Sequence, residues 1–134
     1  MESRVFLDAN IVLDLLSQQR PNHSQATTLI QVLIKRGIQI CISEDILTTV
    51  YYIAKDKQQA IAFFQTVQKR WSILPFGYSV IAQALQYASQ HTVDLEDTLQ
   101  CFCAREHGCT LIVAEDRGFV ECGVKVTDYK GVLS

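Results

Sequence analysis

Short apolar runs alternate along the chain with longer stretches in which apolar residues recur every three or four positions. The short runs are bounded by polar or turn-forming residues, which is typical of buried strands. They cover residues 4–7, 38–42, 71–74, 110–114 and 123–126. The helical spacing covers residues 9–17, 22–36, 43–54, 57–69, 77–90 and 92–106. Strands separated by helices predict an α/β fold, a three-layer α/β/α sandwich with a short parallel sheet.

Short polar side chains and a glycine mark several expected helix ends. Asn22, Ser43 and Asp56 are candidate N-caps, because their side chains can accept hydrogen bonds from the first amides of a helix. Gly37 is expected to end the helix over 22–36. Along 77–90, the spacing predicts that the apolar residues face the core: Val80, Ile81, Ala84, Leu85 and Ala88.

The composition fits one packed domain over residues 1–134. Hydrophobic residues make up 49% of the chain and charged residues 19%, which favours a folded core over disorder. No apolar run approaches the roughly 20 residues of a membrane span, and the first residues lead straight into a predicted strand. We therefore expect a cytoplasmic protein. Its five cysteines include no C-x-x-C pair, so we expect reduced, buried thiols: Cys41, Cys101, Cys103, Cys109 and Cys122.

The net charge of −2 changes the picture of possible partners. A protein whose main role is to bind nucleic acid usually carries a strong basic surplus, which this chain lacks. An enzyme with its acids concentrated in one pocket is still compatible with this charge. The positions of the acids therefore become the informative feature.

Acidic residues follow three of the predicted strands. Asp8 follows the first strand, Glu44 and Asp45 lie just after the second, and Glu115 and Asp116 follow the fourth. The carboxyl ends of parallel strands meet at one edge of a sheet, where ligands bind. The helix predicted over 92–106 adds further acids near its start: Asp94, Glu96 and Asp97.

Carboxylates crowded in one cleft repel each other and raise one another's pKa. Mg²⁺ or Mn²⁺ would relieve this repulsion, because both ions prefer hard oxygen ligands. Such an ion lowers the pKa of bound water and assists displacement at a phosphodiester. The pattern therefore favours metal-dependent phosphodiester hydrolysis.

Each acid also has a purely structural interpretation. Asp8 could cap the following helix, and Asp116 could be a turn residue. The acids at 94–97 could complement a helix dipole. These interpretations do not require the acids to converge, whereas the metal-site hypothesis does.

Three segments resemble motifs of the PIN-domain nucleases, in particular their bacterial VapC-like branch. Residues 5–16, V-F-L-D-A-N-I-V-L-D-L-L, resemble the family opening V-F-L-D-T-N-V-L-L-D-L-L. Residues 94–100, D-L-E-D-T-L-Q, resemble D-F-E-D-A-L-Q. Residues 108–116, G-C-T-L-I-V-A-E-D, followed by Phe119, resemble G-C-D-x-I-I-T-R-N/D before a Phe. The likeness covers nearly the whole chain in order and length.

The resemblance implies an endonucleolytic ribonuclease that uses Mg²⁺ or Mn²⁺. Asp8, Asp97 and Asp116 would be metal ligands, and Asp94 a neighbour or an additional ligand. Asn10 would orient the first aspartate or a metal-bound water. Alignment from Cys109 favours Asp116 as the last acid, whereas alignment from Phe119 favours Glu115.

One position departs from the family pattern. Many members carry a ligating Glu on the helix after the second strand, where this chain has Thr49. Asp45 lies four residues earlier on the same predicted helical face and could compensate for the lost charge. The alternative function is therefore a PIN-like domain with a weakened site, which binds RNA or a protein partner without cutting.

The resemblance also implies partners: an RNA substrate, a second copy in a homodimer, and a small antitoxin if the chain is the toxin of a VapBC-type pair. RNA would need basic groups near the acids, and Arg20, Arg105 and Arg117 are the candidates. The adjacent Tyr51 and Tyr52 could stack on a base, but we expect one of them to belong to the core.

A phosphoacceptor receiver domain shares this fold class and provides a comparison from another functional class. That domain needs an acceptor Asp after its third strand and a Lys after its fifth. Here the third predicted strand runs into Pro75 and Phe76, and no Lys follows the fifth at the expected place. The sequence therefore disfavours a receiver.

Overall fold

A five-stranded parallel sheet forms the centre of the protein. The computed structural model describes residues 3–116 and 119–134. The strands are β1 (Arg4–Leu7), β2 (Gln39–Ser43), β3 (Ser72–Leu74), β4 (Leu111–Val113) and β5 (Lys125–Thr127). They lie in the order β3-β2-β1-β4-β5, and every neighbouring pair is parallel. Because β1 is central, Val5, Phe6 and Leu7 are completely buried.

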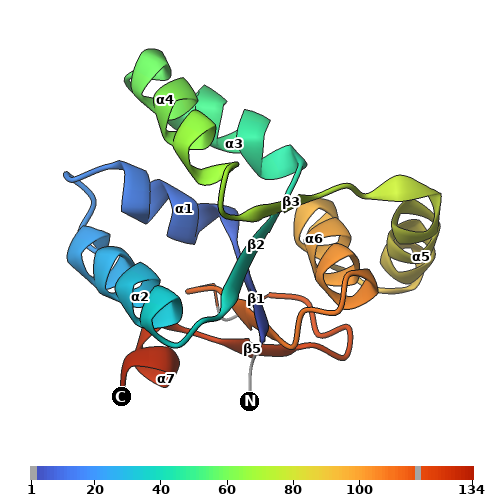
Figure 1. Ribbon diagram of the computed structural model, residues 1–134. Coiled ribbons are helices and arrows are strands. Elements are labelled where there is room, and N and C mark those ends of the chain that lie inside the picture. The colour runs from blue at the N-terminus through green and yellow to red at the C-terminus, as the bar shows by residue number, and fades with distance from the viewer. Residues whose placement is uncertain (1–2, 117–118) are drawn as a thin grey trace.

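Helices cover both faces of the sheet. They are α1 (Ala9–Leu16), α2 (His23–Lys35), α3 (Asp45–Ile53), α4 (Lys57–Val67), α5 (Gly77–Gln90), α6 (Leu95–Glu106) and α7 (Tyr129–Leu133). Figure 1 shows α2 and α7 on one side of the sheet, α5 and α6 on the other, and α3 with α4 at the top. The predicted three-layer α/β/α arrangement is confirmed.

Most expected helix ends are found close to their predicted places. Gly37 follows the end of α2 with φ +69°, a left-handed conformation that glycine adopts readily. Asp56 caps the start of α4, where its carboxylate accepts a hydrogen bond from the Gln59 amide at 3.0 Å. The prediction for Ser43 was wrong: it is the last residue of β2, and its hydroxyl donates to the Asp45 carboxylate. Helix α6 begins at Leu95, later than the predicted residue 92, because Asp94 is its N-cap.

Two predictions about burial are corrected. In α5, Val80 and Ala84 are completely buried, but Ile81 and Leu85 are 43% and 52% exposed. Helix α5 packs mainly against α6, so only a narrow stripe of its apolar residues reaches the interior.

The cysteines also differ from expectation. Cys101 of α6 and Cys122 form a disulfide, whereas Cys41, Cys103 and Cys109 are buried free thiols as predicted. The two bonded residues are 21 positions apart, and the fold brings their Cα atoms to 6.1 Å, a distance that a disulfide spans. Sequence spacing alone carries no sign of such a pairing.

Among the helices of the described residues, none combines the length and apolar character that crossing a bilayer requires.

Candidate active site

Asp8 lies where the central strand passes into the first helix. It follows β1, and its amide donates to the Val113 carbonyl at 3.1 Å, which joins the end of β1 to that of β4. Asp8 occupies the N-cap position of α1, but its side chain makes no capping hydrogen bond. The side chain is nevertheless only 4% exposed. Helix capping therefore does not account for a buried carboxylate at this position.

The electrostatics of Asp8 show which acids surround it. Burial raises its pKa from 3.8 to about 6, and the nearby amides of Ala9 and Asn10 offset part of this rise. The negative charges of Glu96 and Asp116 raise the pKa further. Asp8 therefore lies in an acidic environment that disfavours its own ionisation.

Asp97 faces the same group of acids from the first turn of α6. Partial burial raises its pKa from 3.8 to about 7, and the charges of Asp8, Asp94, Asp116 and Glu96 add to the rise. These acids come from the ends of β1 and β4 and from the start of α6. The structure thus brings together the three predicted ligands, Asp8, Asp97 and Asp116.

Asp94 and Asp116 keep structural roles as well. The Asp94 carboxylate accepts a hydrogen bond from the Asp97 amide at 2.9 Å and so caps α6, as the structural interpretation expected. The Asp116 carbonyl accepts a hydrogen bond from the Phe119 amide at 3.2 Å. Asn10 is an exposed residue of α1, and its orienting role stays a prediction.

The geometry distinguishes the two acids that competed for the last site position. The Glu115 carboxylate accepts a hydrogen bond from the Tyr129 amide at 2.7 Å, at the start of α7. The charge of Asp116, by contrast, acts on both Asp8 and Asp97. Asp116 is therefore the better placed of the two.

Glu96 is the acid whose position the sequence did not indicate. The Thr49 hydroxyl on α3 donates to Glu96 Oε2 on α6 at 2.8 Å. Asp45, expected to compensate for Thr49, accepts from Gln100 Nε2 at 2.9 Å and from the Ser43 hydroxyl. Its charge and a side-chain hydrogen bond also raise the pKa of Glu96. The sequence pattern placed Glu96 with the acids that complement the helix dipole, and its position next to Asp97 was the available signal.

These side chains fit a hard divalent cation by their chemistry. All the donors are carboxylate oxygens, and partial burial and mutual repulsion raise the pKa of Asp8, Asp97 and Glu96. As the side chains stand, residues 3–116 and 119–134 contain no group of three His, Cys, Asp or Glu that could hold a metal ion. Mg²⁺, however, is usually held by one or two carboxylates and keeps several waters. The arrangement is therefore compatible with a water-rich site.

The residues predicted to attract RNA are placed less favourably. Arg105 lies in the last turn of α6 and donates to the Cys122 carbonyl at 3.2 Å, roughly 12 Å along the helix axis from Asp97. Arg117 lies outside the described residues. Tyr52 is 75% exposed and Tyr51 is half-buried, so neither belongs to the fully buried core.

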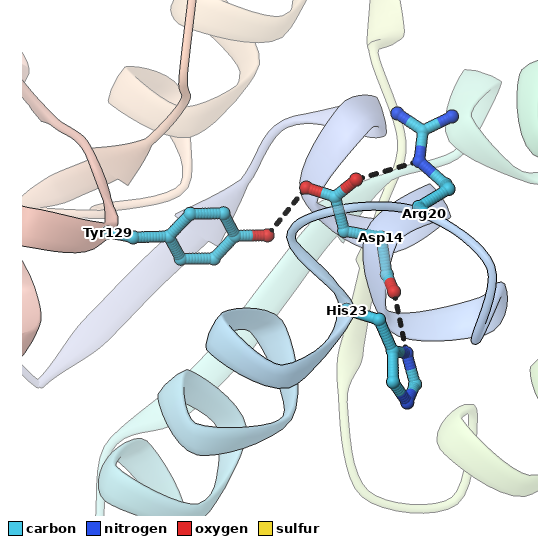
Figure 2. Close-up of polar contacts among 4 residues, drawn as sticks. All are labelled: Asp14, Arg20, His23 and Tyr129. Carbon is cyan, nitrogen blue, oxygen red and sulfur yellow. Dashed lines mark hydrogen bonds and ion pairs between the residues drawn. The ribbon is translucent and has the colours of Figure 1, made fainter.

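A second buried acid, Asp14, belongs to a structural network. Its side chain is paired with Arg20 at 2.7 Å and accepts from the Tyr129 hydroxyl at 2.8 Å. The His23 ring donates to the Asp14 carbonyl at 2.9 Å. Figure 2 shows these contacts converging on Asp14, with the terminal nitrogens of Arg20 pointing away. The network joins α1, α2 and α7, and every oxygen of Asp14 has a partner.

Comparisons with known proteins identify the family of the chain and structures that share its fold. The family model of the PIN domain matches residues 4–118. Ribonuclease VapC1 of Aquifex aeolicus is 32% identical over 127 residues, covering 92% of this chain and 88% of that protein.

Two solved structures share the fold at low sequence identity. Mycobacterium tuberculosis VapC20, a Sarcin-Ricin loop cleaving toxin, has a TM-score of 0.73 and 15% identity, covering 90% of this chain and 95% of that one. A toxin-antitoxin complex from Klebsiella pneumoniae has a TM-score of 0.72 and 19% identity, covering 92% and 96%.

Proposed function

The chain belongs to the PIN-domain family, and from this membership and the site geometry we propose that it is a divalent-metal-dependent endoribonuclease. It would hydrolyse phosphodiester bonds in RNA, as a single domain over residues 1–134. The observation that carries the proposal is the convergence of Asp8, Asp97 and Asp116 at the carboxyl edge of the sheet. The 32% identity to a ribonuclease over most of both chains supports the choice of RNA.

Each acid has a defined part in this proposal. Asp8, Asp97 and Asp116 would hold Mg²⁺ or Mn²⁺, which when bound supplies an activated water and stabilises the negative charge on phosphate. Asp94 fixes the start of α6, and thereby the position of Asp97, through the hydrogen bond to the Asp97 amide. The raised pKa values of Asp8 and Asp97 mean that both carboxyl groups must release protons before a cation binds.

The proposed partners follow from the relatives. A small antitoxin is the expected protein partner, by analogy with the toxin-antitoxin complex that shares the fold. A homodimer and a cytoplasmic location remain predictions. The exposed apolar residues Tyr78, Ile81 and Leu85 of α5 are available for a protein contact of this kind.

Cleavage of a labelled single-stranded RNA with Mn²⁺ tests the proposed activity. The wild-type protein should cut the RNA internally, EDTA should stop the reaction, and Asp8→Asn should reduce the rate at least 100-fold. Equal cleavage by wild type and Asp8→Asn would show that any activity comes from another site or from a contaminant.

Thr49 favours a second candidate function. If the missing acid at this position weakens the site, the protein binds RNA or a partner without cutting it. RNA binding that survives in EDTA, without cleavage in Mn²⁺, would support this alternative.

A further inference from the structure

A groove of about 690 Å³ lies at the far ends of α1 and α3, the helices that follow β1 and β2. One wall comes from residues 13–21, at the end of α1 and the connection to α2. The other wall comes from residues 53–59, at the end of α3 and the start of α4. We call this cavity the α1–α3 groove. Its walls are far apart in the sequence, so only the folded chain forms it.

The polar lining of the α1–α3 groove consists mainly of hydrogen-bond donors. Its side chains that carry N–H groups are Arg20, Lys55, Gln18, Gln19 and Gln59. Among the described residues that line the groove, the only acid is Asp56, whose carboxylate accepts from the Gln59 amide at 3.0 Å as the cap of α4. The lining therefore favours a ligand that presents acceptor oxygens and negative charge.

Arg20 has donors available beyond its structural contact. Its Nε lies 2.7 Å from Asp14 Oδ1, and Figure 2 shows the two terminal nitrogens pointing away from Asp14. Within residues 3–116 and 119–134 these two nitrogens have no hydrogen bond or ion pair, and the side chain is 34% exposed. Because Asp14 already holds the guanidinium in place, a ligand loses little conformational entropy in binding it.

Lys55 provides a second cation on the opposite wall. It is exposed, and no residue in the described part of the chain forms a hydrogen bond or ion pair with it. Its neighbour Lys57 caps the end of α3 instead, where Nζ donates to the carbonyls of Tyr51, Tyr52 and Ala54 at 2.6, 2.9 and 2.8 Å. Those carbonyls are thereby covered, so the negative end of α3 does not repel an anion in the groove.

The α1–α3 groove is continuous with the candidate site along α1. Leu13 and Leu16, which line the groove, lie five and eight residues after Asp8, or roughly 8 and 12 Å along the helix axis. Helices α1 and α3 pack against each other, and Figure 1 shows both running from the strand ends toward the same side of the molecule. A stacked strand of nucleic acid advances roughly 3.4 Å per nucleotide, so these distances correspond to about two to four nucleotides.

We propose that the α1–α3 groove binds the backbone of the RNA strand beyond the cleaved bond, with Arg20 and Lys55 contacting phosphates. This inference rests on the proposed function, because it extends the binding of the same RNA past Asp8. An acidic peptide would offer similar charge, but an RNA strand held at Asp8 already leads toward the groove. The chain thus combines a net charge of −2 with a local pair of cations where its substrate needs them.

Fluorescence anisotropy of a labelled oligouridine of about 12 nucleotides tests the proposal in EDTA, where the RNA is not cut. Each lost phosphate contact should lower the slope of log affinity against log salt by about 0.7, which is about fivefold in affinity between 0.1 and 1 M salt. Lys55→Gln should therefore bind the RNA about fivefold more weakly at 0.1 M salt, with a slope lower by about 0.7. Wild-type affinity and slope in Lys55→Gln, or no binding by the wild type, would overturn the proposal.

Arg20→Lys tests the second cation without leaving Asp14 unpaired. A lysine supplies one ammonium group for Asp14 and no separate terminal nitrogens, so the slope should again fall by about 0.7. The double variant Arg20→Lys with Lys55→Gln should lose about 1.4 in slope. Lys125→Gln is the matched control, because Lys125 is exposed at the start of β5, away from the strand ends that carry the acids; its slope should equal that of the wild type. Thermal denaturation confirms that each variant is folded.

Two further comparisons separate the possible outcomes. If binding of a labelled decaglutamate depends on Lys55 while RNA binding does not, the groove takes an acidic peptide and the proposal is wrong. If both groove variants bind RNA normally while Asp8→Asn loses cleavage in Mn²⁺, the groove proposal fails and the nuclease proposal stands. If the groove variants lose RNA affinity but the wild type never cuts in Mn²⁺, the nuclease proposal fails and the groove proposal stands.

Discussion

Asp8 and Asp14 are both 4% exposed, yet we expect their replacement by asparagine to have opposite effects on stability. Asp14 has partners for every oxygen, whereas Asp8 makes no capping hydrogen bond and faces other acids. Removing the charge should therefore relieve an unfavourable interaction at Asp8 and destroy a favourable network at Asp14. Because the two side chains are equally buried, the difference between the two variants shows which carboxylate stabilises the fold and which one does not.

The pKa of Asp8 sets the magnitude. Each pKa unit corresponds to about 1.36 kcal/mol, so a rise from 3.8 to about 6 corresponds to at most about 3 kcal/mol. At neutral pH and without metal, Asp8→Asn should raise the free energy of unfolding by about 1–3 kcal/mol. Asp14→Asn should lower it by about 2–3 kcal/mol, less than for a fully buried pair because the Arg20 side chain is 34% exposed.

The effect of Asp8→Asn should depend on pH with a definite sign. The folded protein holds the Asp8 proton at pH values where the unfolded chain has already lost it. The wild type should therefore lose stability relative to Asp8→Asn as the pH rises from about 4 to 6. Above pH 6 the difference should stay constant, and below pH 4 it should disappear.

Urea unfolding in EDTA between pH 4 and 8 measures these differences. The unfolding entropy expected for this chain length is about 0.28 kcal/mol per degree. In thermal unfolding at pH 7.5, the melting temperature of Asp8→Asn should therefore be roughly 4–11 °C higher than that of the wild type. Mn²⁺ at 100 times its Kd should stabilise the wild type by about 2.7 kcal/mol and leave Asp8→Asn unchanged. A loss of stability in Asp8→Asn comparable to that in Asp14→Asn would show that Asp8 is held by favourable contacts, and would refute this reasoning.

Further predictions concern the structural contacts and the pH dependence of metal binding. Tyr129→Phe removes the hydroxyl that donates to Asp14 at 2.8 Å, and urea unfolding should show a free energy of unfolding lower by about 1.5–3 kcal/mol. The control Tyr78→Phe changes a side chain that is 89% exposed and should lower it by less than about 0.5 kcal/mol. The Cys101–Cys122 disulfide joins residues 21 positions apart, so removing it with Cys101→Ser and Cys122→Ser should lower the free energy of unfolding by about 3 kcal/mol. Unchanged stability of this double variant under oxidising conditions would contradict a formed disulfide. The affinity for Mn²⁺ should rise between pH 5.5 and 7.5, because the Asp97 carboxyl, with a pKa of about 7, must lose its proton before it binds a cation. An affinity that calorimetry finds to be independent of pH would count against Asp97 as a ligand.

The repeating pattern of the sequence determined the fold class and the edge at which the acids lie. Strand and helix periods are local properties, and each of the five strands can be recognised from a few consecutive residues. Parallel strands then fix where their carboxyl ends lie, so the positions of Asp8 and Asp116 follow almost directly from the order of elements. The PIN-domain resemblance rested on these same ordered segments and is confirmed by the family match.

The tertiary structure alone decided which long-range partners meet. The bond between Thr49 and Glu96, the disulfide between Cys101 and Cys122, and the engagement of Asp45 by Gln100 each depend on how helices pack against one another. A hydrophobic period tells which face of a helix is apolar, but not which residue of a distant segment will lie opposite a given side chain. Those pairings are set by strand order and helix packing, which act between segments that the sequence places tens of residues apart.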